Sequence, residues 1–466
     1  MEINFSENSK LTDFKSVYFI GIGGIGMSAL ARYFKALNYS VGGYDKTPSP
    51  LTDQLMHEGC SVHFEDRGKN LPLEFQDVLS TLIIITPAIP QNHGELNHVR
   101  QAGYTILKRS EVLGLITQSM KGLCVAGTHG KTTTSTLLAH ILHSSKWECS
   151  AFLGGISTNF NSNLLISSKS EYAVIEADEF DRSFLRLSPY GAIITSADPD
   201  HLDIYGTAEK FQEGFQLYAN RINPLGFLVL KEGLPFTSLA ETITYAVGSE
   251  TANFRAYNLR VSGESFLMDV IFKDTRWNDI ELGVPGIHNA ENALGCIALL
   301  VQLGMSESDI RMGLKTFRGV KRRFEYIIRE KNLIYIDDYA HHPKEIEALI
   351  DSIRLMYPTK KITGIFQPHL FSRTADFMDS FAEELSRLDE ILVMPIYPAR
   401  ELPIAGITSD VLVSKINNPQ KKLVEAKNIG EEIAKSNLEV LLTIGAGDID
   451  RIVNLLKKQL NNEQQL

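Results

Sequence analysis

The chain has 466 residues, which is too long for one ordinary domain and predicts about two to four domains with separate cores. Its 46 basic and 56 acidic residues give a net charge of −10, which argues against a protein that coats nucleic acid or lies on an anionic membrane. No apolar run approaches the roughly 20 residues of a membrane span. The opening MEINFSENSKLTDF does not resemble a signal peptide, and the four scattered cysteines favour a cytoplasmic protein.

Strand and helix patterns alternate along the chain, which predicts an α/β protein with mostly parallel sheets and helical crossovers. Three blocks resemble nucleotide-binding folds, and we expect a domain for each. The expected domains are residues 1–117, 118–323 and 324–466.

The first block begins with an apolar strand, SVYFI, that runs into the loop and helix GIGGIGMSALARYFKAL. Gly21, Gly23 and Gly26 form the pattern G-x-G-x-x-G, and Asp45 follows at the end of the second strand. This layout is typical of folds in which loop N–H groups and a helix N-terminus face a pyrophosphate. The alternative is that the glycines serve only close packing of the helix on the strand. No feature here demands nicotinamide chemistry.

The second block carries GTHGKTTT between a strand and a helix with an apolar stripe. The usual phosphate loop reads G-x-x-x-x-G-K-[ST], but here Val125 occupies the position of its first glycine, so the loop is two residues short. In a phosphate loop, Lys131 would reach the β- and γ-phosphates and the hydroxyl of Thr132 would bind Mg²⁺. The alternative is that Lys131 is an ordinary surface lysine at a helix start.

Two acid clusters follow strands of the second block. In EADEFDRSF we favour Glu176, the first acid out of the strand, as a Mg²⁺ ligand, and the remaining acids could form a solvated loop. In SADPDHLDIYG, His201 could complete a Mg²⁺ or Mn²⁺ site or lie on the surface. The pairing of clusters in one block favours a metal-dependent triphosphate site.

The third block adds basic and histidine-bearing loops. Arg323 lies at its junction with the second block and could stabilise a transferring phosphate, or belong to an ordinary basic linker. His341, His369 and Arg373 follow two strands, in DDYAHHP and QPHLFSRT. Ligands collect at the carboxyl ends of strands in open α/β sheets, so these side chains could bind a carboxylate or phosphate. None of them is decisive alone.

Motifs from all three blocks occur in the order found in the Mur ligases, and together they are highly specific. They are GIGGIGMSALA, GTHGKTTT, EADEFDRSF, DHLDIYG, GIHNAENALG, RRFEY, DDYAHHP, QPHLFSRT and YPARELPIAG. The phosphate loop of that family is G-x-x-G-K-[ST], which accounts for the short spacing. The resemblance implies a Rossmann-like UDP-binding domain, a central ATPase domain and a C-terminal Rossmann-like domain that binds the amino acid.

Within the family, the chain most resembles the ligases that join L-alanine to the lactyl carboxylate of UDP-N-acetylmuramate through an acyl phosphate. The resemblance implies ATP and Mg²⁺ (or Mn²⁺), small-molecule partners without nucleic acid or membrane, a cytoplasmic location, and a monomer or homodimer. The near alternative is the ligase that recycles murein tripeptide, because Ala340 of DDYAHHP also occurs there. GIGGIGMSALA and QPHLFSRT favour the alanine ligase, although Leu370 stands where some alanine ligases have arginine.

The resemblance also places roles on matching positions. The UDP-substrate would be bound by Gly21, Gly23, Gly24, Gly26, Asp45, Thr86, Ala88 and His129. ATP would be bound by Gly127, Thr128, Gly130, Lys131, Thr132, Thr133, Asn289, Asn292, Arg323 and Asp338. The metal would be held by Thr132, Glu176 and His201, and alanine by Tyr339, His369 and Arg373. The catalytic residues would be Lys131, Glu176, His201, Arg323 and His341.

Two other classes of function remain open at this stage. One is a nicotinamide-dependent dehydrogenase with a regulatory ATP-binding module. The other is a non-catalytic scaffold, against which the retained Lys131, Thr132, Glu176 and His201 argue. Gln216 stands where some relatives carry a carbamylated lysine, so we expect no carbamate.

Overall fold

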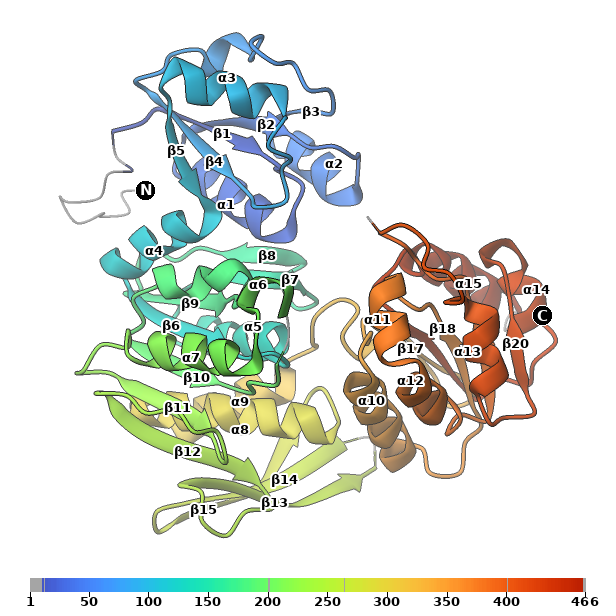
Figure 1. The fold of residues 1–466 in the computed structure, drawn as a ribbon. Helices are drawn as coiled ribbons and strands as arrows, with labels where there is room; N and C mark the ends of the chain where they lie inside the picture. The colour runs from blue at the N-terminus through green and yellow to red at the C-terminus, as the bar shows by residue number, and fades with distance from the viewer. Residues whose placement is uncertain (1–10, 12, 200–201, 264, 400, 464–466) are drawn as a thin grey trace. The chain divides into compact units, whose positions relative to one another are not determined.

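The computed structural model describes residues 11, 13–199, 202–263, 265–399 and 401–463. Within them the chain forms three sheets with helices packed around them, which confirms the predicted α/β class with three domains (Figure 1). The first sheet and most of the second belong to one compact unit, and a second unit comprises the third sheet with residues 260–266 and 284–289. None of the described helices combines the length and apolar character needed to span a bilayer.

The N-terminal domain is a parallel five-stranded sheet in the order β3-β2-β1-β4-β5. Its strands are β1 (Ser16–Ile20), β2 (Ser40–Tyr44), β3 (Ser61–His63), β4 (Thr81–Ile85) and β5 (Thr105–Lys108). Its helices are α1 (Ile25–Ala36), α2 (Pro50–His57), α3 (Gly94–Ala102) and α4 (Arg109–Ser119). The strand order reverses between β1 and β4, and such a switch point is where open α/β sheets bind ligands.

The central domain has a ten-stranded sheet in the order β15-β14-β13-β12-β11-β10-β6-β9-β7-β8. Its strands are β6 (Lys121–Ala126), β7 (Ser150–Ser157), β8 (Ser162–Leu165), β9 (Tyr172–Ala177), β10 (Gly191–Ile194), β11 (Phe227–Lys231), β12 (Glu241–Val247), β13 (Phe254–Ser262), β14 (Ser265–Phe272) and β15 (Thr275–Leu282). Its helices are α5 (Lys131–His143), α6 (Leu202–Tyr205), α7 (Ala208–Ala219), α8 (Ile287–Gln302) and α9 (Glu307–Thr316). The middle strands pair in parallel, as predicted, whereas β7 and β8 are antiparallel.

The parallel strands β10, β6 and β9 bring three loops to one edge of the central sheet. β6 lies between the other two, with Ala126 in register with Ile194 on one side and with Ala177 on the other. The chain leaves these strands as the GTHGKTTT loop, the acidic EADEF segment and the segment 195–199. Strands that are buried along nearly their whole length therefore place polar side chains next to one another where they end.

The C-terminal domain is a six-stranded sheet in the order β16-β17-β21-β18-β19-β20, parallel except for β16. Its strands are β16 (Glu325–Arg329), β17 (Ile334–Asp338), β18 (Ile362–Phe366), β19 (Glu390–Val393), β20 (Lys421–Leu423) and β21 (Val440–Ile444). Its helices are α10 (Pro343–Met356), α11 (Phe371–Asp376), α12 (Met378–Leu385), α13 (Ser409–Lys415), α14 (Ile429–Ile433) and α15 (Asp450–Glu463). α10 begins at Pro343, as predicted, and the His342 and Glu345 side chains cap it.

One hydrophobic core joins the first two sheets, because α1 packs on β7 and β8 of the central sheet. The rings of Tyr33 and Phe152 meet edge to face with centroids 5.1 Å apart. At the other end of the contact, the fully buried Asn163 of β8 donates to the carbonyl of Ile25 at 2.6 Å and to Oγ of Ser28 at 2.9 Å. These bonds fix the first turn of α1, and with it the glycine loop, to the central sheet.

Candidate active site

Both glycine loops lead from a buried strand into a helix whose first turn carries neither an acidic residue nor a side-chain cap. α1 follows Gly24 and α5 follows Gly130. The first N–H groups of a helix have no partner within the helix, and the helix dipole makes this end positive. Both loops therefore keep backbone donors for an anion, as the sequence patterns predict.

The short phosphate loop depends on two glycines with positive φ. Gly127 has φ +141° and Gly130 has φ +81°, which side chains on an L-residue rarely permit. A Cβ at Gly130 would also come within 2.7 Å of Oδ1 of Asn292, which α8 supplies. The tight turn that compresses the loop thus brings its backbone against a predicted ATP residue.

Lys131 lies over the loop and is neutralised by a carboxylate that the sequence did not single out. Its ammonium is 2.7 Å from Oε2 of Glu179 and donates to the carbonyl of Gly127 at 2.6 Å. The Glu179 side chain is only 2% exposed. Burial alone would lower the pKa of Lys131, but the charges of Glu179 and Glu176 outweigh it and raise that pKa, so the lysine is charged at neutral pH.

Thr132 and Glu176 meet where a metal ligand pair was predicted. Oγ1 of Thr132 donates to Oε1 of Glu176 at 3.1 Å. A hydroxyl and a carboxylate are hard oxygen ligands of the kind that Mg²⁺ takes while keeping several waters, so the pair fits this ion. Among the described residues no group of three or more His, Cys, Asp and Glu forms a closed metal cluster. His201, the third predicted ligand, lies outside the described residues.

The remaining residues of this loop are held by the segment after β10. Thr128 donates through Oγ1 to the carbonyl of Asp198 at 2.8 Å, and the N–H of His129 donates to Oγ of Ser196 at 2.8 Å. Thr133 is half-buried in the first turn of α5. These contacts position the loop backbone, and the predicted substrate contact of His129 stays a prediction.

The two asparagines predicted for adenine differ in their surroundings. Asn292 is 9% exposed and lies against the phosphate loop, as described above. Asn289, one turn earlier in α8, donates through Nδ2 to the carbonyl of Pro285 at 2.8 Å. Their adenine role stays a prediction.

The N-terminal loop is held by Asp45 at the end of β2. Oδ2 of Asp45 accepts from the N–H of Gly23 at 2.7 Å, and the N–H of Gly21 donates to the carbonyl of Tyr44 at 2.7 Å. The methyl group of Thr86 lies beside Gly21, and Ala88 is exposed on the loop after β4. Apart from His129, the predicted UDP residues thus gather at the neighbouring ends of β1, β2 and β4, where Asp45 holds the loop itself.

A cavity of about 100 Å³ in the first unit extends from the start of α1 to Glu176 and Asp178 at the end of β9. It runs between α1, α4, β7 and the end of β9. Its charged lining residues are Arg109, Glu176 and Asp178, and Gly26 and Gly154 also border it. Gly26 belongs to the predicted UDP loop and Glu176 to the predicted metal pair, so the cavity lies between the two predicted substrates.

The second unit collects the predicted residues of the third block. Asp338 accepts from the N–H groups of Phe324 and Ala340, each at 2.7 Å, and burial raises its pKa to about 6. The guanidinium of Arg323 stacks 5.0 Å from the ring centroid of Tyr339. The strand end of β17 therefore holds three residues that the sequence predicts for ATP and the amino acid.

Two histidines lie on the same rim. Nδ1 of His341 donates to the carbonyl of Tyr339 at 2.9 Å, and its ring centroid is 6.2 Å from that of His369. Arg373 donates to Nδ1 of His369 at 3.4 Å, and burial lowers the pKa of His369 to about 4, so this ring is neutral at pH 7. Arg373 consequently supplies the positive charge that a carboxylate ligand would meet.

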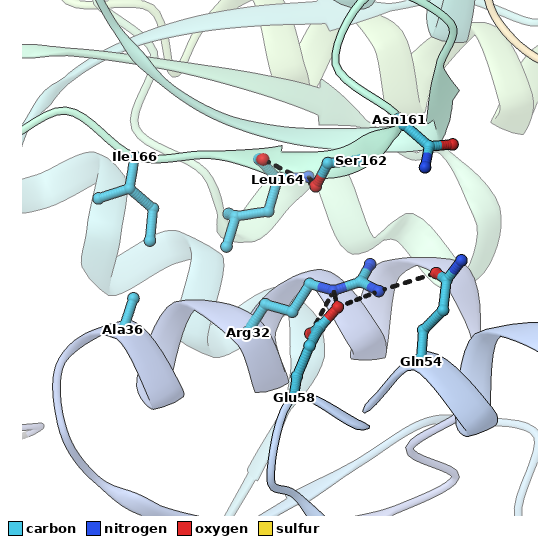
Figure 2. A pocket seen from close by; sticks show the side chains of 8 residues that line it. All are labelled: Arg32, Ala36, Gln54, Glu58, Asn161, Ser162, Leu164 and Ile166. Atoms are coloured by element: carbon cyan, nitrogen blue, oxygen red, sulfur yellow. Dashed lines mark hydrogen bonds and ion pairs between the residues drawn. The ribbon is translucent and has the colours of Figure 1, made fainter. Parts of the chain in front are cut away.

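A second hollow of about 500 Å³ is lined by Arg32 and Ala36 of α1, by Gln54 and Glu58 at α2, and by residues of and around β8 (Figure 2). Arg32 forms a bidentate pair with Glu58 at 2.8 and 3.0 Å and donates to Gln54 at 3.1 Å. It also donates to Oδ1 of Asn163 at 2.6 Å. The Arg32 side chain is only 11% exposed, so its charge is satisfied inside the protein and braces α1.

Similarity to known proteins agrees with this geometry. Family models of the Mur ligases match residues 16–121 (catalytic domain), 125–300 (middle domain) and 322–448 (glutamate ligase domain). The UDP-N-acetylmuramate–L-alanine ligase of Porphyromonas gingivalis is 49% identical over 96% of this chain and 99% of its own length. That of Cytophaga hutchinsonii is 49% identical over 96% and 97%. The chain belongs to the Mur ligase family.

Solved structures lead to the same family. The crystal structure of UDP-N-acetylmuramate-alanine ligase MurC from Thermotoga maritima covers 96% of this Mur ligase and 99% of its own chain, with 28% identity and a TM-score of 0.83. A murein peptide ligase from Psychrobacter arcticus has 24% identity and a TM-score of 0.67 over 96% and 99%, and shares the fold. The resemblance seen in the sequence motifs is confirmed.

Three residues in and around the site were not predicted from the sequence. Glu179 was left among the acids of a solvated loop, yet it is buried against Lys131. Arg109 and Asn163 belong to no motif, and only the packing of α1 and α4 on the central sheet brings them to the site. No local spacing could have found them, because their partners are distant in the sequence.

Proposed function

We propose that this Mur ligase joins L-alanine to the lactyl carboxylate of UDP-N-acetylmuramate, with ATP converted to ADP and phosphate, in peptidoglycan precursor synthesis. Relatives with this name are 47–49% identical over almost the whole chain. The observation that carries the proposal is the strand end where Lys131, Thr132 and Glu176 meet, with a cavity that extends from there to Gly26. We place the reaction in the cytoplasm.

The first step is a phosphoryl transfer. A lactyl carboxylate oxygen attacks the γ-phosphorus, the bond from that phosphorus to the β,γ-bridging oxygen breaks, and ADP leaves. Lys131 and the N–H groups of the 127–132 loop hold the phosphates and stabilise the charge that develops on them. Mg²⁺, when bound to Thr132 and Glu176, neutralises phosphate charge.

The second step is acyl transfer. The amine of alanine attacks the carbonyl carbon of the acyl phosphate, the bond from that carbon to the phosphate oxygen breaks, and the amine proton leaves with phosphate or water. Arg373 would bind the alanine carboxylate beside the neutral ring of His369. Asp338 and His341 would complete the ATP side from the C-terminal domain, and Arg323 from its junction with the central domain. We assign the three domains to residues 1–117, 118–323 and 324–466.

The test is phosphate release by the purified chain with ATP, Mg²⁺, UDP-N-acetylmuramate and one amine at a time. Release is expected with L-alanine and not without the sugar nucleotide. The matched arm replaces L-alanine by the tripeptide L-Ala-γ-D-Glu-diaminopimelate, the substrate of a recycling ligase. Turnover with the tripeptide alone would contradict the proposal.

A further inference from the structure

The guanidinium of Arg109 lies over the glycine loop that follows β1, although Arg109 belongs to the first turn of α4. A Cβ at Gly26 would overlap Nη1 of Arg109 and would come within about 3 Å of its side-chain carbons. Gly26 thus permits this close approach, and a side chain at position 26 would displace the guanidinium. Its missing side chain leaves the space in which an arginine reaches the N-terminus of α1.

Most of the N–H donors of the Arg109 guanidinium are not used by the described residues. In the part of the chain that the structure describes, its one side-chain partner is Asp178, whose Oδ2 is 3.0 Å from Nη2. The two side chains are 25% and 35% exposed, and both line the cavity of about 100 Å³ that begins at Gly26. A guanidinium carries five N–H donors, so most of them remain for a ligand in that cavity.

The glycine loop itself supplies no positive side chain. GIGGIGMSALA contains only apolar residues, glycines and a serine, and the first turn of α1 offers backbone N–H groups alone. A diphosphate carries at least two negative charges at neutral pH, and a planar guanidinium can bind two of its oxygens at once. Among the described residues that line the cavity, Arg109 is the one with a positively charged side chain, and it also lies against the loop.

We infer that Arg109 is a side-chain ligand of the diphosphate of the sugar nucleotide, and that Asp178 holds its guanidinium in place until that substrate binds. The inference rests on the proposed sugar-nucleotide substrate. On binding, the diphosphate takes the N–H donors that face Gly26 and competes with Asp178 for the guanidinium. A second oxyanion, the lactyl carboxylate, will enter the same cavity, so the two sources of negative charge must be separated by experiment.

The experiment is a calorimetric titration of the whole chain with UDP, which has the diphosphate but no carboxylate, and with UDP-N-acetylmuramate, which has both. Arg109→Ala should weaken the binding of both ligands by about 10- to 100-fold, the range for loss of a charge-assisted hydrogen bond. Arg109→Lys keeps the charge but not the planar fork, and should lie between Arg109→Ala and the wild type. Arg100→Ala removes an exposed arginine of the same domain and should bind like the wild type.

Three outcomes overturn the inference. The first is UDP binding to Arg109→Ala within twofold of the wild type. The second is loss of affinity for UDP-N-acetylmuramate alone, which would assign Arg109 to the carboxylate. The third concerns Asp178→Asn, which frees the guanidinium and should bind UDP at least as tightly as the wild type. If this variant instead loses as much UDP affinity as Arg109→Ala, the ion pair and not the guanidinium supports the loop.

Turnover gives an independent readout. Arg109→Ala should raise KM for UDP-N-acetylmuramate with little change in kcat, whereas a misfolded site would lower kcat and Tm together. If the alanine variant does not fold, the same KM measurement is made on Arg109→Lys. If the wild type binds UDP and Arg109→Ala does not, but neither releases phosphate with L-alanine, the proposed function fails and the inference stands.

Discussion

Each of the two glycine loops of this Mur ligase has a cation beside it, but the two cations differ in type and in origin. The loop at residues 127–132 carries its own lysine, whereas the loop at residues 21–26 receives Arg109 from a helix more than eighty residues later. Each cation is paired with a carboxylate, and the two carboxylates are neighbours in the chain. Asp178 pairs with Arg109 and Glu179 pairs with Lys131. The end of β9 thus supplies the carboxylates that pair with both cations.

The pairs differ in burial, and this difference should decide how each behaves. Lys131 and Glu179 are 15% and 2% exposed, whereas Arg109 and Asp178 are 25% and 35% exposed. A buried pair is costly to break because one charge is left without compensation, and an exposed pair contributes little to stability. The 127–132 loop, which we propose binds the triphosphate, is therefore held by a largely buried pair, whereas the cation beside the 21–26 loop is more accessible to solvent.

The largest expected difference between the loops is in their need for metal. Removing Mg²⁺ with EDTA should abolish phosphate release, because Thr132 and Glu176 would hold an ion that neutralises the phosphates. UDP binding to the other loop should change by less than about twofold, since its charges are met by N–H groups and Arg109. Calorimetry with UDP in the presence of EDTA measures the change in UDP binding. Restoring Mg²⁺ is the control for the loss of phosphate release.

Lys131→Ala should lower kcat by about 100- to 1000-fold or more, because the loop loses the cation that stabilises the transferring phosphate. UDP affinity should stay within about twofold of the wild type. Lys121→Ala is the matched control, since Lys121 forms an exposed pair with Glu171 at the start of the same strand system. Near-normal turnover in Lys131→Ala would show that the 127–132 loop is not the site of phosphate transfer.

Substitutions of the two carboxylates test the burial argument directly. Glu179→Gln should lower the free energy of unfolding by about 3 kcal/mol, because the buried charge of Lys131 loses its partner. Asp178→Asn should lower it by less than about 1 kcal/mol, because that pair is solvent-screened. Urea unfolding of both variants at neutral pH measures the difference. Equal effects would mean that burial does not distinguish the loops.

Asn163→Ala should lower the free energy of unfolding by about 1–2 kcal/mol, since it leaves the carbonyl of Ile25 and a donor of Arg32 without their partner. It should also raise KM for UDP-N-acetylmuramate and leave KM for ATP unchanged, because only the first loop is anchored through α1. Asn70→Ala, at an exposed position of the same domain, is the control. An equal rise in both KM values would argue against a role in positioning that loop.

Most of the fold could be predicted from local patterns. The strand at 16–20 and the helix start at Pro343 were confirmed, because buried strands and capped helices have signatures that span only a few residues. The antiparallel β7–β8 pair was not predicted, since pairing direction depends on how the chain returns to the sheet. The contact between Thr132 and Glu176 could be predicted, because Glu176 lies near the end of β9 and Thr132 follows β6, the parallel strand beside it.

The partners of the cations could not be predicted in this way. Four acids within six residues look alike in EADEFDRSF, and only burial separates Glu179 from the others. Arg109 and Asn163 act between domains, so their roles depend on how α1 packs on the central sheet rather than on spacing. The sequence therefore predicts the chemistry of the site, whereas the structure is needed to find the charged and polar partners that position its residues.

The adjacency of Asp178 and Glu179 has a consequence for how this segment can vary. The two side chains leave one strand end toward different cations, Arg109 on α4 and Lys131 on α5. A single inserted or deleted residue here would shift both carboxylates and break at least one pairing. The segment after β9 should accordingly tolerate exchange of its exposed side chains but not a change in length. In an engineered variant it should be transferred whole, with its length unchanged.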